Sequence, residues 1–247
     1  MALPVFGFVT RHEQPLADGI EREAEWMALC AATGRASAHL WHGTPGWVVP
    51  RSYLRAPGFA DAREQWSARR RPLHVRSSGG GLVPQGPGIV NLSLAWCTDS
   101  AKPYGIEAIY QDLCDQLSAA LARLDLRCEV GDVAGSFCDG RFNLAVGGRK
   151  IVGTAQWWRR IGAQPVVLAH AVLVVDADPL ALADEANAVE QALGRPTRYR
   201  AEAMTSIVRA CGDLQDREGD VATTLARVQQ VVAEQFARVV PPRVDAS

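Results

Sequence analysis

Apolar side chains recur every three or four residues in several stretches of the chain, a pattern that predicts amphipathic helices. The clearest stretch is Gly105–Leu126, where isoleucines and leucines line one face. Asp18–Gly34 has the same periodicity, an acidic first turn and a terminal glycine, where helices commonly end. Two further helices are predicted at Pro179–Leu193 and Asp220–Val239, and a charged surface helix is predicted at Asp61–Arg71.

Strand patterns gather in the middle of the chain. Residues 89–96 alternate so that one side of the predicted strand carries Val90, Leu92, Leu94 and Trp96. Leu73–Arg76 predicts a strand that leads into a glycine-rich loop, and the apolar run Pro165–Val175 predicts a buried strand. His39–Val49 predicts a short strand pair around a Thr-Pro-Gly turn. Central strands surrounded by helices indicate an α+β domain.

A Gly-Gly pair at positions 147 and 148 predicts a two-residue hairpin turn. This turn sets a register that opposes Val146 and Arg149, Ala145 and Lys150, Asn143 and Val152, and Arg141 and Thr154. Opposed residues share a face of the sheet. One face of the hairpin therefore carries the apolar residues Phe142, Leu144, Val146 and Ile151, and the other presents Lys150, Asn143, Thr154 and Arg141.

Composition narrows the class of partner. Of the 247 residues, 48% are hydrophobic and 21% are charged, and the formal net charge is -1, which argues against a disordered chain or a polybasic nucleic-acid binder. Neither a run of 18 apolar residues nor a secretory leader is found in the sequence, so we expect a cytoplasmic protein without a membrane segment. The six cysteines lack metal-binding spacing, and we expect free thiols at Cys30, Cys97, Cys114, Cys128, Cys138 and Cys211.

Two residues near the hairpin carry candidate chemistry. Cys138 lies in the loop before the first strand, where it can curl toward the side that presents Lys150. A thiol has an ordinary pKa near ~8.5, and a nearby ammonium favours the nucleophilic thiolate. The same ammonium can stabilise the oxyanion that forms when a thioester carbonyl is attacked. A packed loop thiol and an exposed hairpin lysine are the alternatives, and spacing alone favours them.

The glycine-rich segment RSSGGGLVPQGPG, residues 76–88, exposes backbone amides that can approach a ligand closely. It matches neither the P-loop nor the dinucleotide-binding glycine pattern. A plain glycine-rich turn explains the segment equally well.

Several segments together resemble the biotin and lipoate protein ligase superfamily, which includes ATP-dependent lipoate ligases and ATP-independent octanoyltransferases. RSSGGG with GIVNLSL is similar to the superfamily's glycine loop and next strand, GRKIVGTAQ to its lysine motif, and HAVLVVD to the strand after it. SFCDGRFNLAV resembles the Ser-Tyr-Cys-Pro-Gly-Arg segment of the cysteine-dependent octanoyl/lipoyl transferase branch. The resemblance implies one catalytic domain over residues 1–240, with a mixed, mostly antiparallel sheet flanked by helices, and a flexible tail at 241–247.

The resemblance also assigns roles to residues. Cys138 falls at the nucleophile and Lys150 at the shared lysine. The residues placed at the substrate are Arg76, Ser78, Gly79, Gly80, Gly81, Gln85, Asn143, Gly153, Thr154 and His170. A hydrogen-bonded structural role is the more common one for a histidine such as His170.

The sequence departs from the superfamily's pattern at several positions. Gln85 stands where many members have a histidine, and Asn143 stands where ligases commonly carry an aspartate. A neutral amide is a poor magnesium ligand, which disfavours adenylate chemistry. Asp139 replaces a proline and would oppose thiolate formation at Cys138.

The resemblance implies an octanoyl or lipoyl transferase that acts through a cysteine acyl-enzyme and needs no cofactor. The implied partners are lipoyl-domain proteins, such as the glycine cleavage H protein or dehydrogenase E2 subunits, and acyl carrier protein as a possible donor. An eight-carbon tail offers about 5 kcal/mol of burial, at ~0.8 kcal/mol per methylene, so an apolar tunnel is expected. Arg69–Arg71 is a hypothetical docking site for an acidic lipoyl domain.

Two alternatives remain open. One is an ATP-dependent lipoate ligase that forms a lipoyl-adenylate with ATP and magnesium. The other is a non-catalytic homologue that binds acyl chains or docks a lipoyl domain.

Overall fold

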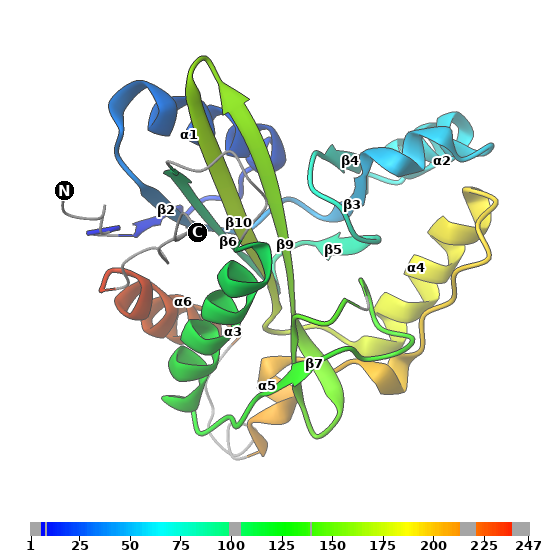
Figure 1. The fold of residues 1–247 in the computed structure, drawn as a ribbon. Coiled ribbons are helices and arrows are strands. Elements are labelled where there is room, and N and C mark those ends of the chain that lie inside the picture. Colours follow the sequence, from blue (N-terminus) through cyan, green and yellow to red (C-terminus); the bar gives the residue numbers. More distant parts are fainter. Residues whose placement is uncertain (1–5, 8, 99–104, 139, 213–220, 239–247) are drawn as a thin grey trace.

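Two β-sheets organise the computed structural model, which describes residues 6, 7, 9–98, 105–138, 140–212 and 221–238 (Figure 1). The large sheet contains, in spatial order, β1 (Thr10–Arg11), β2 (Ser37–Trp41), β6 (Ile89–Cys97), β10 (Gln164–Val174), β9 (Arg149–Ile161), β8 (Asn143–Val146) and β7 (Glu129–Gly131). The small sheet contains β4 (Leu73–Arg76), β3 (Gly46–Pro50) and β5 (Val83–Gln85). The pairs β1–β2 and β3–β4 are parallel and the others are antiparallel, so the mixed, mostly antiparallel α+β fold is confirmed.

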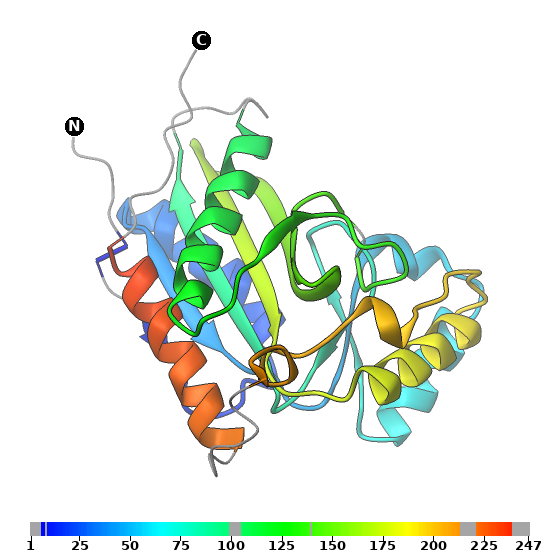
Figure 2. The same cartoon turned by 90° about the horizontal axis from the view of Figure 1, so that it is seen from below.

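Helices cover both faces of the large sheet (Figures 1 and 2). α3 (Ile106–Ala122) and α6 (Val221–Phe236) pack side by side on one face, and α1 (Gly19–Thr33) packs on the opposite face. α2 (Phe59–Ala68) and α4 (Pro179–Ala192) pack with the small sheet. The short helices are η1 (Arg51–Arg55), η2 (Ala201–Ala203) and α5 (Ile207–Ala210). Every helix in the described part is too short or too polar to cross a membrane.

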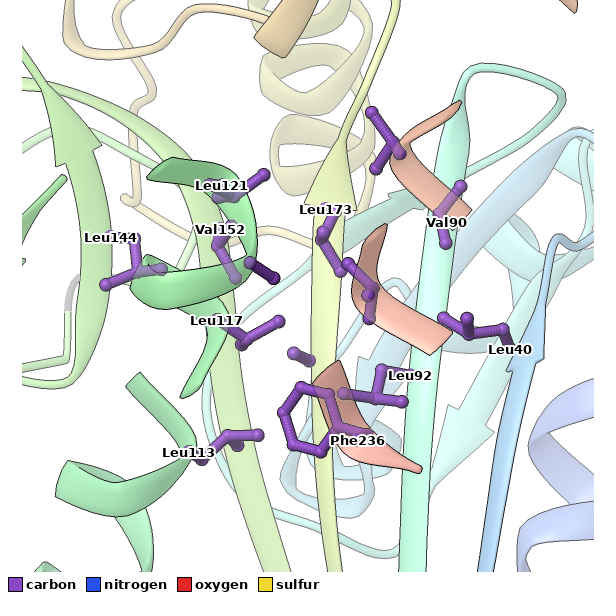
Figure 3. Packing of buried hydrophobic residues seen from close by; sticks show 14 of the residues in the cluster. Leu40, Val90, Leu92, Leu113, Leu117, Leu121, Leu144, Val152, Leu173 and Phe236 are labelled. Carbon is purple, nitrogen blue, oxygen red and sulfur yellow. The ribbon is translucent and has the colours of Figure 1, made fainter. Parts of the chain in front are cut away.

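The main hydrophobic core lies between the large sheet and the α3–α6 pair (Figure 3). Leu113, Leu117 and Leu121 of α3 are at most 3% exposed and meet Leu92 and Leu173 of the central strands. The predicted alternation of β6 is confirmed, because its four alternate apolar residues all belong to this core. The apolar face predicted for the helices and the apolar side predicted for this strand therefore pack against each other in one core.

Most predicted elements are confirmed within a few residues, but three predictions need correction: the pairing of two strands, the exposure of one helix and the register of the hairpin. β2 and β3 both form, yet they do not pair: β2 joins β1 and β6, whereas β3 joins β4 and β5. Both strands are almost fully buried, each between two partners of its own sheet. The helix predicted at Asp61–Arg71 is confirmed as α2, but it buries one face through Phe59, Ala62 and Trp66.

The hairpin register is partly wrong. Val146 opposes Arg149 and Ala145 opposes Lys150 as predicted, but Leu144, not Asn143, opposes Val152. Ile151 is therefore an extra residue of β9, a β-bulge that the turn residues do not encode. Arg141 precedes β8 and has no strand partner.

The domain limits stay a prediction. The tail predicted at 241–247 lies outside the described residues.

Candidate active site

The loop before β8 presents Cys138 in a left-handed backbone conformation, with φ +49°. A non-glycine residue pays roughly 1–2 kcal/mol for this conformation, so neighbouring groups must stabilise it. Phe137 is anchored between Trp47 and Tyr199, with ring centroids 5.8 and 4.9 Å away. The residue before Cys138 is therefore fixed in the core that includes the small sheet.

Two side chains from the hairpin hold the carbonyl groups of this turn. The Lys150 Nζ donates to the carbonyl oxygen of Phe137 and, at 2.7 Å, to that of Cys138. The Asn143 Nδ2 donates to the Cys138 carbonyl at 3.1 Å and also to the Gly140 carbonyl. The side chains of Lys150 and Asn143 are 5% and 1% exposed, so they support the cysteine turn from the interior of the protein.

The bulge at Ile151 explains how Lys150 reaches this place. Residues 150 and 153 would face opposite sides of a regular strand. The extra residue brings both to one side, where a Cβ added to Gly153 would lie 3.1 Å from the Lys150 Nζ. A glycine at 153 therefore leaves room for the ammonium.

The glycine loop meets the thiol beside Gly80, whose φ is +106°. A Cβ added there would lie 2.5 Å from the Cys138 Sγ and 2.9 Å from the Arg76 Nη2, so sulfur and guanidinium approach the same point. Arg76 donates to the carbonyls of Gly79 at 2.9 Å and Gly81 at 2.7 Å, which fixes the loop. Burial lowers the pKa of Arg76, while the charges of Cys138 and Glu23 act to raise it.

Two cavities meet at Cys138. We call the first the inner cavity; its walls are largely apolar and include Ile20, Val48, Val83, Ala155, Ala171 and Val172. The second, the outer cavity, has a volume of about 330 Å³ and is lined by residues that include Gly79, Gly80, Tyr110, Phe142, Asn143 and Thr154. Burial and the charge of Cys138 raise the pKa of Tyr110. The thiol therefore contacts both an apolar pocket and a wider opening.

Three of the predicted substrate residues serve as walls or supports. Gln85 and Asn91 exchange two side-chain hydrogen bonds of 2.9 Å in the wall of the inner cavity. The Thr154 hydroxyl donates to the Phe142 carbonyl and lines both cavities. Ser78 is 3% exposed and its Oγ lies 2.9 Å from the His170 Nε2.

Eight of the ten predicted substrate residues thus line the two cavities together with Cys138. The other two lie just behind these walls: Ser78 contacts His170, and a Cβ added to Gly81 would lie 3.5 Å from the Cys138 backbone nitrogen. Lys150 lies behind the cysteine turn. The Lys150 ammonium contacts carbonyl groups, and it lines a separate neighbouring cavity with Phe137 and Met204. The cation that faces the inner cavity is Arg76. Asp139 lies outside the described residues.

Sequence reasoning missed Glu23, which lies 147 residues before His170 but accepts from its ring at 2.8 Å. No signal near His170 could have identified this carboxylate, because α1 reaches the sheet only through tertiary packing. Two arginines of the hypothetical docking site Arg69–Arg71 have partners within the protein. Arg71 forms an ion pair with Glu185, and Arg69 lies 4.7 Å from the centre of a Trp66 ring. Among the described residues, no group of three or more His, Cys, Asp or Glu could hold a metal ion.

The chain is similar to known proteins in both sequence and fold. A model of the lipoyl protein ligase A/B catalytic domain matches residues 60–237. An uncharacterized protein of Cupriavidus necator is 41% identical over 238 residues, which covers 92% of this chain and 94% of that protein. An octanoyl-[GcvH]:protein N-octanoyltransferase of Kyrpidia tusciae is 39% identical over 199 residues, with 76% of this chain and 68% of the relative covered. The crystal structure of a lipoate-protein ligase A bound with ATP has the same fold, with a TM-score of 0.65, 17% identity, and 93% and 85% of the two chains covered.

Proposed function

Because the chain belongs to the family of the lipoyl protein ligase A/B catalytic domain and is an acyltransferase, we propose that it carries an octanoyl group on Cys138 and transfers it to a lysine of a lipoyl domain. The relative from Kyrpidia tusciae is named for an octanoyl-GcvH donor, so we propose the same donor class for this chain. The observation that carries the proposal is the position of the Cys138 thiol at the junction of the inner and outer cavities.

We assign the two cavities to the two substrates of such a transfer. The apolar inner cavity takes the hydrocarbon tail, whose burial contributes about 0.8 kcal/mol per methylene; since its volume is about 30 Å³, its walls must move apart to admit eight carbons. The outer cavity is the wider one, and we assign to it the lysine side chain of the lipoyl domain. The acyl carbon then lies at the sulfur, between the tail and the attacking amine.

Polar and charged side chains surround the cysteine loop. Arg76 supplies a positive charge beside the sulfur, where it suits the oxyanion that forms when an acyl carbonyl is attacked. We assign to Lys150 the task of holding the strained turn through the Phe137 and Cys138 carbonyls. Asn143 has the same task, which requires a donating amide and which a carboxylate cannot perform.

Mass spectrometry of the intact protein after exposure to an octanoyl thioester without ATP tests this proposal. We expect one octanoyl adduct on the wild-type protein, removed by hydroxylamine as a thioester would be, and none on Cys138→Ser. The matched control is Cys128→Ser, another partly buried thiol, which should keep the adduct. The chain has two lysines, Lys102 and Lys150, so a hydroxylamine-resistant amide adduct is easily mapped.

Two results would replace the proposal by another function. Modification of a lipoyl domain that requires free lipoate or octanoate together with ATP would identify a ligase. Binding of several octanoyl donors without adduct or turnover would identify a non-catalytic homologue.

A further inference from the structure

A histidine between two buried partners lies in the wall of the inner cavity. His170, on β10, directs its Nδ1 to the Glu23 Oε1 at 2.8 Å and its Nε2 to the Ser78 Oγ at 2.9 Å. Glu23 and Ser78 are 4% and 3% exposed. The three groups therefore form a line of hydrogen bonds that joins α1, β10 and the glycine loop.

The rest of the network determines which nitrogen carries the hydrogen. The Trp41 Nε1 can only donate, and it donates to the Ser93 Oγ at 3.0 Å. Ser93 in turn donates its hydrogen to the Glu23 Oε1 at 2.8 Å. Glu23 is thus an acceptor, and the Nδ1 of His170 carries the hydrogen that it accepts. The Nε2 of neutral His170 is left with a lone pair.

His170 and Cys138 line the same inner cavity. Within the described part of the chain, the titratable groups that line the inner cavity are Glu23, Arg76, Cys138 and His170. Arg76 stays protonated, and Glu23 accepts two hydrogen bonds. Ser78, the partner of His170, lies two residues before Gly80, which contacts the Cys138 sulfur. Of these four groups, His170 has the ring nitrogen that can both accept and release a proton.

We propose that His170 moves the proton that acyl transfer requires, with Glu23 and Ser78 as positioning residues; this inference rests on the proposed function. When the Cys138 thiol attacks an acylated lysine, the Sγ–C bond forms, His170 takes the thiol proton and returns it to the departing amine nitrogen as the C–N bond breaks. In the reverse sense, an acceptor lysine amine forms the new C–N bond, the Sγ–C bond breaks, and its proton passes through His170 to the sulfur. Each half-reaction leaves the imidazole neutral.

Ser78 suits both states of the ring. Its hydroxyl donates to the Nε2 of neutral imidazole, turns its hydrogen away when the Nε2 takes a proton, and can then accept from the Nε2–H of imidazolium, so the ring keeps its position. Glu23 stabilises the positive charge that forms in between.

The test uses acyl-enzyme prepared in advance and compares two acceptors. A lipoyl-domain lysine must lose a proton when it is acylated, whereas a small thiol attacks as the thiolate and needs no proton transfer. We expect His170→Gln to slow transfer to the lysine at saturation by about 100-fold or more, and to slow transfer to the thiolate less than about 5-fold. Glu23→Gln and Ser78→Ala should show a smaller loss, again confined to the lysine acceptor. Glu25→Gln, an exposed carboxylate of the same helix, should match the wild type.

The thiolate reaction is also the control for folding, because a misfolded variant would lose both reactions. Equal losses with both acceptors, or no loss with either, would overturn the role of His170. Failure of the wild-type protein to form an acyl-enzyme would instead overturn the proposed function.

Discussion

The thiol of Cys138 is placed by contacts that single residues make with its backbone. Its φ of +49° is stabilised by the Lys150 ammonium and the Asn143 amide, which bind the carbonyl group of Cys138 itself. Gly80 closes the other side, where a Cβ would meet the sulfur. The position of the sulfur therefore depends on the absence of a side chain at Gly80 and on the two hydrogen-bond donors, Lys150 and Asn143.

Gly80→Ala tests the tight contact at the sulfur. The new methyl group would lie 2.5 Å from the Cys138 Sγ, on a backbone with φ +106° that alanine rarely adopts. We expect the rate of Cys138 acylation to fall by about 100-fold or more, because displacement of a reacting atom by an ångström has an effect of that size. The rate of adduct formation, followed by intact mass, measures it.

Gly131→Ala on β7 is the matched control, because Gly131 lines neither cavity and no atom lies within 4 Å of a Cβ built on it. Its acylation rate should stay within a few-fold of the wild type. Similar rates for the two variants would show that the close contact at Gly80 has no consequence for the thiol.

At the scale of elements, the bulged hairpin of β8 and β9 supports the cysteine loop. The bulge at Ile151 brings Lys150 to the side of Gly153, and the first residue of β8 is Asn143. Both donors thus come from one hairpin, and both reach carbonyl groups of the segment that precedes it. A change in either donor should disturb the loop without disturbing the sheet.

Asn143→Asp changes this support by replacing a donor with an acceptor. The carboxylate would face the carbonyl oxygens of Cys138 and Gly140, and it would attract the Lys150 ammonium away from them. We expect the steady-state rate of octanoyl transfer to fall by about 10- to 100-fold, the range that corresponds to loss of a buried hydrogen bond.

Gln65→Glu, on the exposed face of α2, introduces the same charge away from the site and should leave the rate unchanged. A full rate for Asn143→Asp would show that the Asn143 amide is not needed to hold the loop.

At the scale of the whole molecule, two hydrophobic cores meet at the site. The main core lies on the α3–α6 face of the large sheet, and a second core joins the small sheet to α2 and α4. Phe137 belongs to the second core, whereas Leu144 belongs to the first, so the cysteine loop spans the boundary between them. The stability of the molecule and the geometry of the site are therefore linked.

The pH dependence of stability follows from a buried histidine on β2. His39 is 9% exposed, stacks on Trp26 at 3.9 Å, and leaves its Nε2 without a hydrogen-bond partner; burial lowers its pKa to about 4. The unfolded chain binds this proton near pH 6.5 and the folded chain does so near pH 4, so stability is complete above 6.5 and declines as the pH falls between these values. The loss attributable to His39 is about 3 kcal/mol.

The variant His39→Phe keeps an aromatic ring for the stack but cannot be protonated. We expect the difference in free energy of unfolding between pH 7 and pH 4, from urea denaturation, to be smaller than in the wild type by about 3 kcal/mol. An unchanged difference would mean that His39 is not the group whose protonation destabilises the fold.

The sequence by itself determined the elements and much of the site. Periodicity predicted α1, α3, α4, α6 and β6, because amphipathic patterns record which face of an element is buried, and a continuous apolar run predicted β10. The resemblance of the motifs around Gly79–Gly81, Cys138 and Lys150 to a known superfamily indicated which loops and strands converge. The periodic patterns and the motifs are both local features of the chain.

Tertiary structure alone decided how the elements meet. It separated β2 from β3, introduced the bulge at Ile151, and directed the Lys150 amine to carbonyl groups while Arg76 took the place beside the sulfur. It also joined Glu23 to His170 across 147 residues. Such contacts depend on the packing of distant segments, for which the spacing of residues along a chain contains no direct signal.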